Sequence, residues 1–421
     1  MGGHATKEMA QYVIHTLREA GHEALLAGGC VRDMLLGLRP TDYDVATSAT
    51  PDQVKPLFRR VLMVGAKFGV AMVILHRRRI EVTTFRTDVS YSDGRRPDAV
   101  KFVSARQDAI RRDFTINGMF LDLLENKVVD YVGGQADLKA GVIRAIGQPE
   151  QRFAEDYLRM LRAVRFAARF DFALQPETAG AIREHAGRIT QISGERIREE
   201  LEKMFVRPSA AKAMELMHEL GLLRAFLPEL YAKEGLYERA LRRMQAVGPR
   251  CDVLLSLAAL LCELRAGPQP QKASLVGHTQ IRAIIRRWGG SNAMKDSLEW
   301  MAQHLDDWRA GQEMSLAALK RLAAKRDGQR LVRLWRAQEQ QECGSMRFCR
   351  VLARRLGRLK ASQIAPPPLV SGKHLKRLGL SEGPLLGKIL SAVYEAQLNE
   401  LIRTRPAAME LARELMRKEK G

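Results

Sequence analysis

A pair of glycines near the N-terminus has the composition of a phosphate-binding turn. Gly28 and Gly29 follow an apolar run and open a segment with helical spacing. Backbone amides at the start of a helix have no intrahelical partner, and glycine lets a phosphate approach them closely. Arg32, one turn further along, is placed to reach the same phosphates. Because most glycine pairs merely form turns, this motif needs support from its neighbours.

Two aspartates follow at a spacing that suits metal-dependent phosphate chemistry. Asp42 lies thirteen residues after Gly29 and Asp44 two residues later, and on a strand residues i and i+2 project from the same face. Neighbouring carboxylates repel unless a cation lies between them, and Mg²⁺ prefers oxygen ligands. Magnesium held there with a nucleoside triphosphate would activate a 3′-hydroxyl and stabilise the leaving pyrophosphate. An isolated Asp-x-Asp is more often a solvated turn; the glycine pair upstream favours the catalytic interpretation.

Glu81 is a candidate third carboxylate. It lies in the run RIEVTTF, whose alternation puts Glu81, Thr83 and Phe85 on one face of a strand. A solvated glutamate on a strand fits the same pattern equally well, so both interpretations stay open.

The elements that must position these residues change character near residue 146. Before it, short β-branched runs such as RRVLMVG, FGVAMVIL, RIEVTTFR and VKFV alternate with turns, which predicts an α+β head built on a small mixed β-sheet with helices. After it, apolar residues recur at three- and four-residue spacing, which predicts an all-helical remainder. The proline-rich stretches 266–274 and 364–372 are expected to separate helical subdomains.

Charge is distributed unevenly along the 421 residues. The net charge is +21; residues 1–150 hold 21 Lys/Arg against 18 Asp/Glu, and the remainder holds 48 against 30. Such a surplus attracts a polyanion through counterion release, although charge can also serve solubility alone. No apolar run approaches the roughly 18 residues needed to cross a bilayer. Five cysteines without a C-x-x-C pair argue against a disulfide framework or a zinc site and favour a cytoplasmic protein.

The run Arg111–Asn117 groups basic, acidic and amide side chains before an apolar segment. Arg112 is suited to bind phosphate or ribose, and Asp113 and Asn117 to order the loop or the sugar. By itself, such a cluster is more often a helix cap.

The run Glu155–Phe166 predicts one helix with Asp156, Arg159 and Arg162 on a shared face. A surface ion pair between Asp156 and Arg159 is the simpler explanation. As a base-selecting pair, the carboxylate would accept from the exocyclic amine of cytosine or adenine, and the guanidinium would donate to ring acceptors. Uracil or guanine would leave a buried hydrogen-bonding group of the pair without a partner, which would cost about 1–3 kcal/mol of binding free energy.

These motifs resemble, in order, the class II (bacterial-type) tRNA nucleotidyltransferases. The segments GGCVRDMLLG…TDYDVAT, IRRDFTINGM, DYVGGQADL, RFAEDYLRMLRAVRF and ISGERIREEL cover roughly residues 20–210. The family is a branch of the polymerase-β superfamily that it shares with bacterial poly(A) polymerases. The resemblance implies a nucleotidyltransferase fold in a seahorse-like chain: a catalytic head (1–145), a nucleotide-selecting neck (146–205), a body (206–330) and a tRNA-binding tail (331–421).

The resemblance also implies roles for individual residues. Magnesium would bind Asp42 and Asp44, with Glu81 as a further catalytic acid. Base selection would fall to Asp156 and Arg159, with Glu155 orienting Arg159. Ser193 would cap the helix that begins ISGERIREEL, which would support the neck, and DYVGGQADL would be a hinge. The nucleotide-binding residues implied by the motifs are Gly29, Arg32, Arg112, Asp113, Asn117, Asp156, Arg159, Arg162 and Arg165.

A polar segment between the catalytic strand and RRDFT favours one branch of the family. FRTDVSYSDGRRPDAVKF, with Asp93, Arg95 and Arg96, resembles the flexible loop of CCA-adding and A-adding enzymes. We therefore expect a monomeric enzyme that adds C, C and A to the tRNA 3′ end from CTP and ATP. An A-adding enzyme and a poly(A) polymerase are the alternatives, and intact Asp42, Asp44, Asp156 and Arg159 argue against an inactive RNA-binding protein. Basic C-terminal helices, with Lys373, His374, Lys376 and Arg377 nearby, are expected to bind the tRNA elbow by shape.

Overall fold

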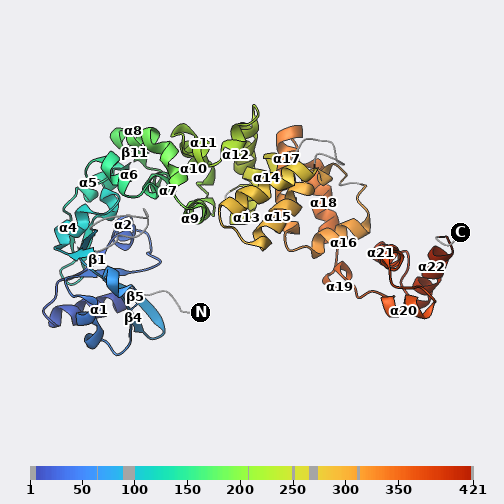
Figure 1. Ribbon diagram of the computed structural model, residues 1–421, viewed down its shortest axis with the longest axis horizontal. Helices are drawn as coiled ribbons and strands as arrows, with labels where there is room; N and C mark the ends of the chain where they lie inside the picture. Colours follow the sequence, from blue (N-terminus) through green and yellow to red (C-terminus); the bar gives the residue numbers. More distant parts are fainter. Residues whose placement is uncertain are drawn as a thin grey trace. The chain divides into compact units, whose positions relative to one another are not determined.

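The computed structural model describes residues 6–63, 65–88, 100–206, 208–248, 252–264, 274–310 and 313–418. The chain divides into two compact units, which Figure 1 shows coloured along the sequence. The first unit comprises Met1–Glu229 with Arg287–Gly289, and the second comprises Leu230–Arg286 with Gly290–Gly421.

A seven-stranded sheet forms the centre of the head in the first unit. Its strand order is β3-β4-β5-β2-β1-β8-β9, and only β2 and β5 run parallel. The sheet is therefore mixed, as predicted. The strands are β1 Ala24–Ala27, β2 Asp44–Thr47, β3 Val61–Leu62, β4 Val70–Leu75, β5 Arg78–Thr84, β8 Phe120–Asp122 and β9 Lys127–Val129.

The hairpin between β4 and β5 turns through two basic residues. His76 and Arg77 have φ of 45° and 65°, as a two-residue turn with positive φ at both central positions requires. The pairing of Leu75 with Arg78 closes the hairpin. The turn brings Arg78 to the start of β5.

Helices cover the two faces of the sheet. Helix α1 (Lys7–Glu19) packs on β1 and β2 through an apolar stripe that includes Val13, Ile14 and Leu17. A second apolar cluster joins strand residues such as Ala46 to helix α4 (Ala105–Ile110). Because side chains alternate along β2, Asp44 shares the α4 side with Ala46. Two further two-stranded sheets pair β6 Arg86–Asp88 with β7 Val100–Phe102, and β10 Val142–Ile143 with β11 Ala173–Leu174.

The single helix predicted over Glu155–Phe166 is wrong. Helix α6 (Pro149–Glu155) ends before Asp156, which has φ −157° and ψ 102°, and α7 (Leu158–Phe170) starts after it. The Asp156 carboxylate accepts the Leu158 N–H at 3.1 Å, and such local bonds let aspartate compete with helical hydrogen bonding. The rest of this unit is helical: α2 Gly29–Leu35, α3 Pro51–Val54, α5 Gly134–Ala140, α8 Pro176–His185, α9 Gly194–Phe205, α10 Ala210–Glu219 and α11 Leu222–Phe226.

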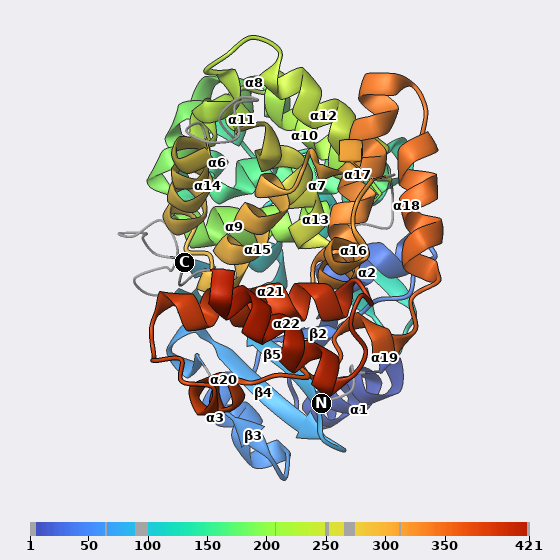
Figure 2. The same cartoon turned by 90° about the vertical axis from the view of Figure 1, so that its right-hand side faces the viewer.

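The second unit contains no strand among its described residues, and Figures 1 and 2 show it as helices only. Helices α20–α22 enclose an apolar cluster that includes Leu375, Ile389 and Ala412. Residues 365–371 lack helix, as the proline-rich sequence predicted, whereas most of 266–274 lies outside the described residues. The helices are α12 Leu236–Ala246, α13 Val253–Leu261, α14 Ser274–Arg287, α15 Asn292–Gln303, α16 Leu316–Ala324, α17 Gly328–Cys343, α18 Arg347–Gly357, α19 Ala361–Ile364, α20 Gly372–Arg377, α21 Pro384–Leu398 and α22 Arg405–Lys418.

Over the part of the chain that the structure describes, every helix is too short or too polar to span a bilayer.

Candidate active site

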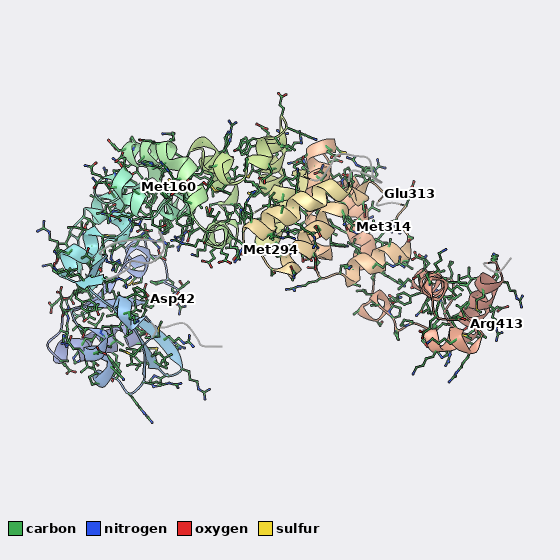
Figure 3. All side chains as sticks on the ribbon, in the orientation of Figure 1. Asp42, Met160, Met294, Glu313, Met314 and Arg413 are labelled. Atoms are coloured by element: carbon green, nitrogen blue, oxygen red, sulfur yellow. The ribbon has the colours of Figure 1, made fainter. Side chains whose placement is uncertain are left out.

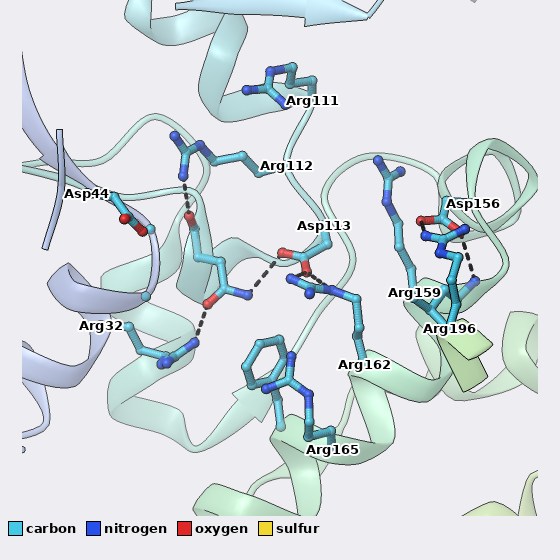
Figure 4. A pocket seen from close by; sticks show the side chains of 15 residues that line it. Arg32, Asp44, Arg111, Arg112, Asp113, Asp156, Arg159, Arg162, Arg165 and Arg196 are labelled. Atoms are coloured by element: carbon cyan, nitrogen blue, oxygen red, sulfur yellow. Dashed lines mark hydrogen bonds and ion pairs between the residues drawn. The ribbon is translucent and has the colours of Figure 1, made fainter. Parts of the chain in front are cut away.

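A polar pocket of about 450 Å³ opens in the first unit (Figure 4). Its walls come from the β1–α2 turn, the segment after α4, and the start of α7 and α9. All nine predicted nucleotide-binding residues line it, so residues up to 136 positions apart in the sequence meet here. The described residues that line it are Gly28, Gly29, Arg32, Asp44, Arg111, Arg112, Asp113, Asn117, Asp156, Leu158, Arg159, Arg162, Arg165, Phe166 and Arg196.

The glycine turn at the pocket has a conformation that only glycine adopts readily. Gly28 has φ 72° and ψ −130° and is the N-cap of α2. A Cβ on Gly28 would lie 2.9 Å from Nη1 of Arg112. Gly28 and Gly29 both line the pocket, and the unpaired amides at the start of a helix suit a phosphate.

Arg112 is held against this turn by a buried carboxylate. Its Nε and Nη2 donate to Asp108 at 3.1 and 2.8 Å, and Arg111 also donates to Asp108. Although burial alone would raise the pKa of Asp108, the charges of Arg112 and Arg111 hold it below its usual value. Asp108 thus stays ionised and fixes both guanidinium groups at the pocket wall.

The three predicted acids gather at the start of β2. Asp44 begins β2, and its Cα is paired in register with that of Glu81 on β5. Although part of the Asp44 side chain is exposed, desolvation by the surrounding protein, followed by the charges of Glu81 and Asp42, raises the pKa of Asp44 to about 6. Asp42, which Figure 3 labels in the head, comes two residues before β2 begins, so the prediction that both aspartates lie on a strand is wrong for Asp42. The charge of Asp42 acts on the Asp44 carboxyl, which supports the expectation that the two carboxylates serve one site.

The carboxylates of Asp42 and Asp44 could supply part of the ligand set of a metal ion. Among the described residues, no group of three or more His, Cys, Asp or Glu side chains forms a metal-binding set. Mg²⁺ commonly takes one or two protein carboxylates and completes its shell with substrate phosphates and water. Asp42 and Asp44 beside a phosphate-binding turn fit that incomplete protein ligand set.

A chain of hydrogen bonds crosses the floor of the pocket (Figure 4). Arg32 donates to Asn117 at 2.5 Å, Asn117 donates to Asp113 at 2.9 Å, and Arg162 donates to Asp113 at 2.8 and 2.6 Å. Although burial opposes it, the charge of Arg162 holds the pKa of Asp113 well below its usual range. Asp113 and Asn117 therefore order the loop, one of their two predicted tasks.

Asp156 and Arg159 have separate partners. Asp156 accepts from Arg196 at 2.7 Å, whereas Arg159 donates through Nη1 to Glu155 at 2.5 Å and to the Arg152 carbonyl at 2.9 Å. The simple Asp156–Arg159 ion pair is therefore wrong, and the predicted orientation of Arg159 by Glu155 is confirmed. Asp156 and Arg159 therefore both line the pocket, and each is held by its own hydrogen-bond partner.

An aromatic ring supports the remaining arginines. The guanidinium carbons of Arg165, Arg32 and Arg162 lie 4.2, 4.9 and 5.6 Å from the centroid of Phe166. Arg165 also donates to buried Glu200 at 2.7 Å. These contacts keep the cationic side chains at the pocket wall.

Sequence reasoning missed Arg111, Arg196 and the apolar lining residues Leu158 and Phe166. Arg196 was expected only to support the neck; Ser193 is the N-cap of α9, as predicted, but without a side-chain capping bond. Arg196 lies forty residues from Asp156, so no local spacing links them. The predicted loop residues Asp93, Arg95 and Arg96 lie outside the described residues.

Comparison with known families defines the class of protein first. The family described as "Poly A polymerase head domain" matches residues 24–144, and "Probable RNA and SrmB- binding site of polymerase A" matches residues 171–233. With the mixed sheet, the glycine turn and the acidic cluster, these matches define a nucleotidyltransferase of the polymerase-β superfamily.

Individual relatives narrow this class. The CCA-adding enzyme of Lactobacillus johnsonii is 39% identical over 284 residues, 67% of this chain and 68% of its own. That of Lactobacillus helveticus is 38% identical over 299 residues, 70% and 71% of the two chains. The Geobacillus stearothermophilus enzyme is 44% identical over 223 residues, 53% and 55%. This chain belongs to the family of CCA-adding enzymes.

Solved structures agree with the assignment over nearly the whole chain. The Bacillus stearothermophilus CCA-adding enzyme in complex with CTP has a TM-score of 0.74 at 29% identity, covering 98% of this chain and 99% of its own. The Thermotoga maritima CCA-adding enzyme complexed with tRNA has a TM-score of 0.66 at 20% identity over 98% and 95%, and supports the fold alone.

Proposed function

We propose that this chain adds C, C and A to the 3′ end of tRNA from CTP and ATP, releasing pyrophosphate. The observation that carries the proposal is a single pocket in which the glycine turn and Asp44 lie together with Asp156 and Arg159. Groups suited to a triphosphate, to a metal and to base edges thus line one cavity. Relatives named CCA-adding enzymes at about 40% identity support the same reaction.

The triphosphate would lie along the basic wall of the pocket. The first amides of α2 and the guanidinium of Arg112 would donate to its phosphate oxygens. Asp42 and Asp44 would hold magnesium, with Glu81 adding negative charge beside them. When bound, magnesium supplies activation of the 3′-hydroxyl and neutralises charge on the leaving pyrophosphate.

Base choice would come from Asp156 and Arg159. Asp156 accepts one bond from Arg196 and one from a backbone amide, and a carboxylate offers about four acceptor sites. It would therefore still accept the exocyclic amine of cytosine or adenine. Among the described residues, Arg159 makes its hydrogen bonds through Nη1, so its other N–H groups would serve base acceptors. Uracil and guanine present carbonyls where Asp156 needs a donor.

The matched head family keeps poly(A) synthesis and A addition as the competing reactions. A tRNA lacking its last three nucleotides, incubated with Mg²⁺ and labelled CTP or ATP, separates them. We expect two cytidines and one adenosine, after which extension stops. Tailing of any RNA by ATP alone would indicate a poly(A) polymerase, and extension only of tRNA already ending in CC would indicate an A-adding enzyme.

Asp42→Ala tests the metal site within the same assay. Removal of this carboxylate is expected to abolish incorporation of both nucleotides while tRNA binding stays within about threefold of wild type, because few RNA contacts are lost. Binding without incorporation by the wild-type chain would instead indicate a non-catalytic RNA-binding protein.

A further inference from the structure

A second cavity, of about 760 Å³, lies beside the Asp42–Asp44 segment in the first unit. Its lining includes Lys7 and Glu8 at the start of α1 and Arg78 at the start of β5. The loop that leads into β2 supplies Arg39, Thr41 and Tyr43. Thr41 and Tyr43 belong to the motif TDYDVAT but were given no role there, and none of the residues of this cavity lines the nucleotide pocket.

The acidic segment contributes residues to both cavities. Thr41 and Tyr43 line the second cavity, whereas Asp44 lines the nucleotide pocket. Tyr43 and Asp44 are neighbours in the sequence and line different cavities, so the second cavity lies beside the segment that carries Asp42 and Asp44. A molecule bound in the second cavity therefore lies next to the acids assigned to the reaction.

Positive charge in the second cavity lacks the pairing found in the first. In the nucleotide pocket, Arg112, Arg162 and Arg196 each donate to an aspartate. Across the described part of the chain, by contrast, no ion pair or hydrogen bond is formed by the side chains of Lys7, Arg39 or Arg78. Among the described residues of the lining, Glu8 is the single acid beside Lys7, Arg39 and Arg78, so positive charge is in excess there. Such a lining attracts a phosphate group.

Tyr43 adds an aromatic surface to this basic lining. The ring is half-buried and lies in the wall with Arg39. Proteins that hold single-stranded nucleic acid combine cations that follow the backbone with aromatic rings that contact base or sugar. The second cavity has both parts.

We infer that the second cavity holds the acceptor RNA strand just before its 3′ end, with a backbone phosphate between Arg39 and Arg78 and a sugar or base against Tyr43. The inference rests on the proposed function, because the reaction needs an RNA 3′-hydroxyl beside Asp42 and Asp44. A phosphate held beside this segment positions the strand for attack. Arg39, Arg78 and Tyr43 are thus positioning residues.

The leaving pyrophosphate is the other source of phosphate at this place. It forms from the two outer phosphates of the bound nucleotide, and the glycine turn that would hold them lines the first pocket. Tyr43 also offers a surface that pyrophosphate does not use. Acceptor RNA is therefore favoured, and the two sources differ in what they would do to a variant.

The test uses Arg39→Ala/Arg78→Ala in the full-length chain. The probe is a fluorescent minihelix that ends where CCA would begin, bound without nucleotide and followed by anisotropy. We expect its Kd to rise about tenfold for each arginine removed, and the slope of log K against log salt to fall by about 0.7 for each. The KM for CTP and the inhibition constant of pyrophosphate are expected to stay within about twofold of wild type.

Matched controls come from the same hairpin. Arg77 and Arg79 flank Arg78, are exposed and do not line the cavity, so Arg77→Ala and Arg79→Ala are expected to bind the minihelix like wild type. Arg39→Lys/Arg78→Lys keeps both charges and is expected to regain most of the affinity. A thermal melt shows whether each variant is folded.

Three results would overturn the inference: unchanged minihelix binding by a folded double alanine variant, equal losses in the Arg77 and Arg79 controls, or a rise in the pyrophosphate inhibition constant with unchanged RNA affinity. If the proposed function itself were wrong, the outcome would differ: the wild-type chain would incorporate no CTP into any RNA.

Discussion

The arginines of the nucleotide pocket are fixed by partners before any substrate arrives. Arg112 is held by Asp108, Arg162 by Asp113 and Arg165 by Glu200. Groups that are already oriented lose little further freedom on binding and need little reorganisation during the reaction. The supporting carboxylates should therefore matter nearly as much as the residues that contact the nucleotide.

Arg196→Ala tests whether the support of Asp156, the proposed base-selecting acid, matters for base choice. Without the 2.7 Å bond from Arg196, Asp156 loses one of its two supports and should accept the wrong base more readily. We expect the preference for CTP over UTP to fall about tenfold, the value of one charged hydrogen bond. Arg198→Ala on the same helix, which bonds Glu202 and the Trp288 carbonyl away from the pocket, is the control. An unchanged preference in Arg196→Ala would show that Arg196 only stabilises the fold.

Asp108 gives a prediction about pH and stability. It is 1% exposed, and its pKa is lowered by Arg112 and Arg111 against the effect of burial. A lowered folded-state pKa stabilises above the unfolded value of about 4, and this contribution is lost as the pH falls through the folded value. Asp108→Asn should therefore lower the free energy of unfolding by roughly 1–3 kcal/mol between pH 5 and 8, a difference that shrinks below about pH 4.

Urea unfolding followed by far-UV circular dichroism measures this difference at each pH. Asp52→Asn, an exposed aspartate at the start of α3, is expected to change stability by less than about 0.5 kcal/mol. A difference that grows on acidification would contradict the assignment.

Local sequence patterns identified some site residues and could not identify others. Asp44 and Glu81 were predictable because each lies in a short strand pattern, and parallel pairing brings them into register. The partnership of Arg196 with Asp156 was not predictable, since their separation of forty residues follows from the packing of α9 on α7. Residues linked by tertiary packing alone leave no spacing to detect.

At the scale of elements, the β1–α2 turn shows what a backbone conformation contributes. Gly28→Ala would force a Cβ into a backbone region reserved for glycine and towards Arg112. We expect a loss of about 1–3 kcal/mol in stability and a rise of at least tenfold in the KM for CTP, measured by steady-state incorporation. Gly37→Ala is the control, because Gly37 also has positive φ, at 69°, but a Cβ there meets nothing within 4 Å. It should lose stability with an unchanged KM; a rise in both variants would argue against a specific phosphate turn.

The break between α6 and α7 shows where element prediction failed. The spacing of apolar residues predicted a continuous helix, and it remains helical on both sides of Asp156. The spacing of apolar residues indicates which face of a helix is buried. It gives no sign that one side chain, here that of Asp156, accepts a hydrogen bond from the backbone N–H two residues later and interrupts the helix. The strands of the head were predictable because alternation and turn residues agreed there.

At the scale of the whole molecule, positive charge is concentrated in the C-terminal part of the chain. The residues after position 150 carry a net charge of +18. Part of this charge lies at a cavity of about 460 Å³ in the second unit, which is lined by Arg347, Arg350 and Arg354 of α18. Neither Arg350 nor Arg354, both exposed, forms an ion pair within the described part of the chain. We therefore expect α18 to bind tRNA phosphates.

Arg350→Glu tests this expectation against a matched change of net charge. Arg282→Glu alters an exposed arginine of the same unit that is already paired with Asp296 and Glu299, so little cation is available there for RNA. If phosphates contact α18, Arg350→Glu should weaken tRNA binding about tenfold and reduce the salt slope by about 0.9, the value of one duplex phosphate contact. Arg282→Glu should have less than a third of that effect, and both variants should keep the wild-type KM for CTP, since the nucleotide pocket lies in the first unit. Equal weakening by the two substitutions would mean that tRNA senses only total charge, and the contact on α18 would have to be abandoned.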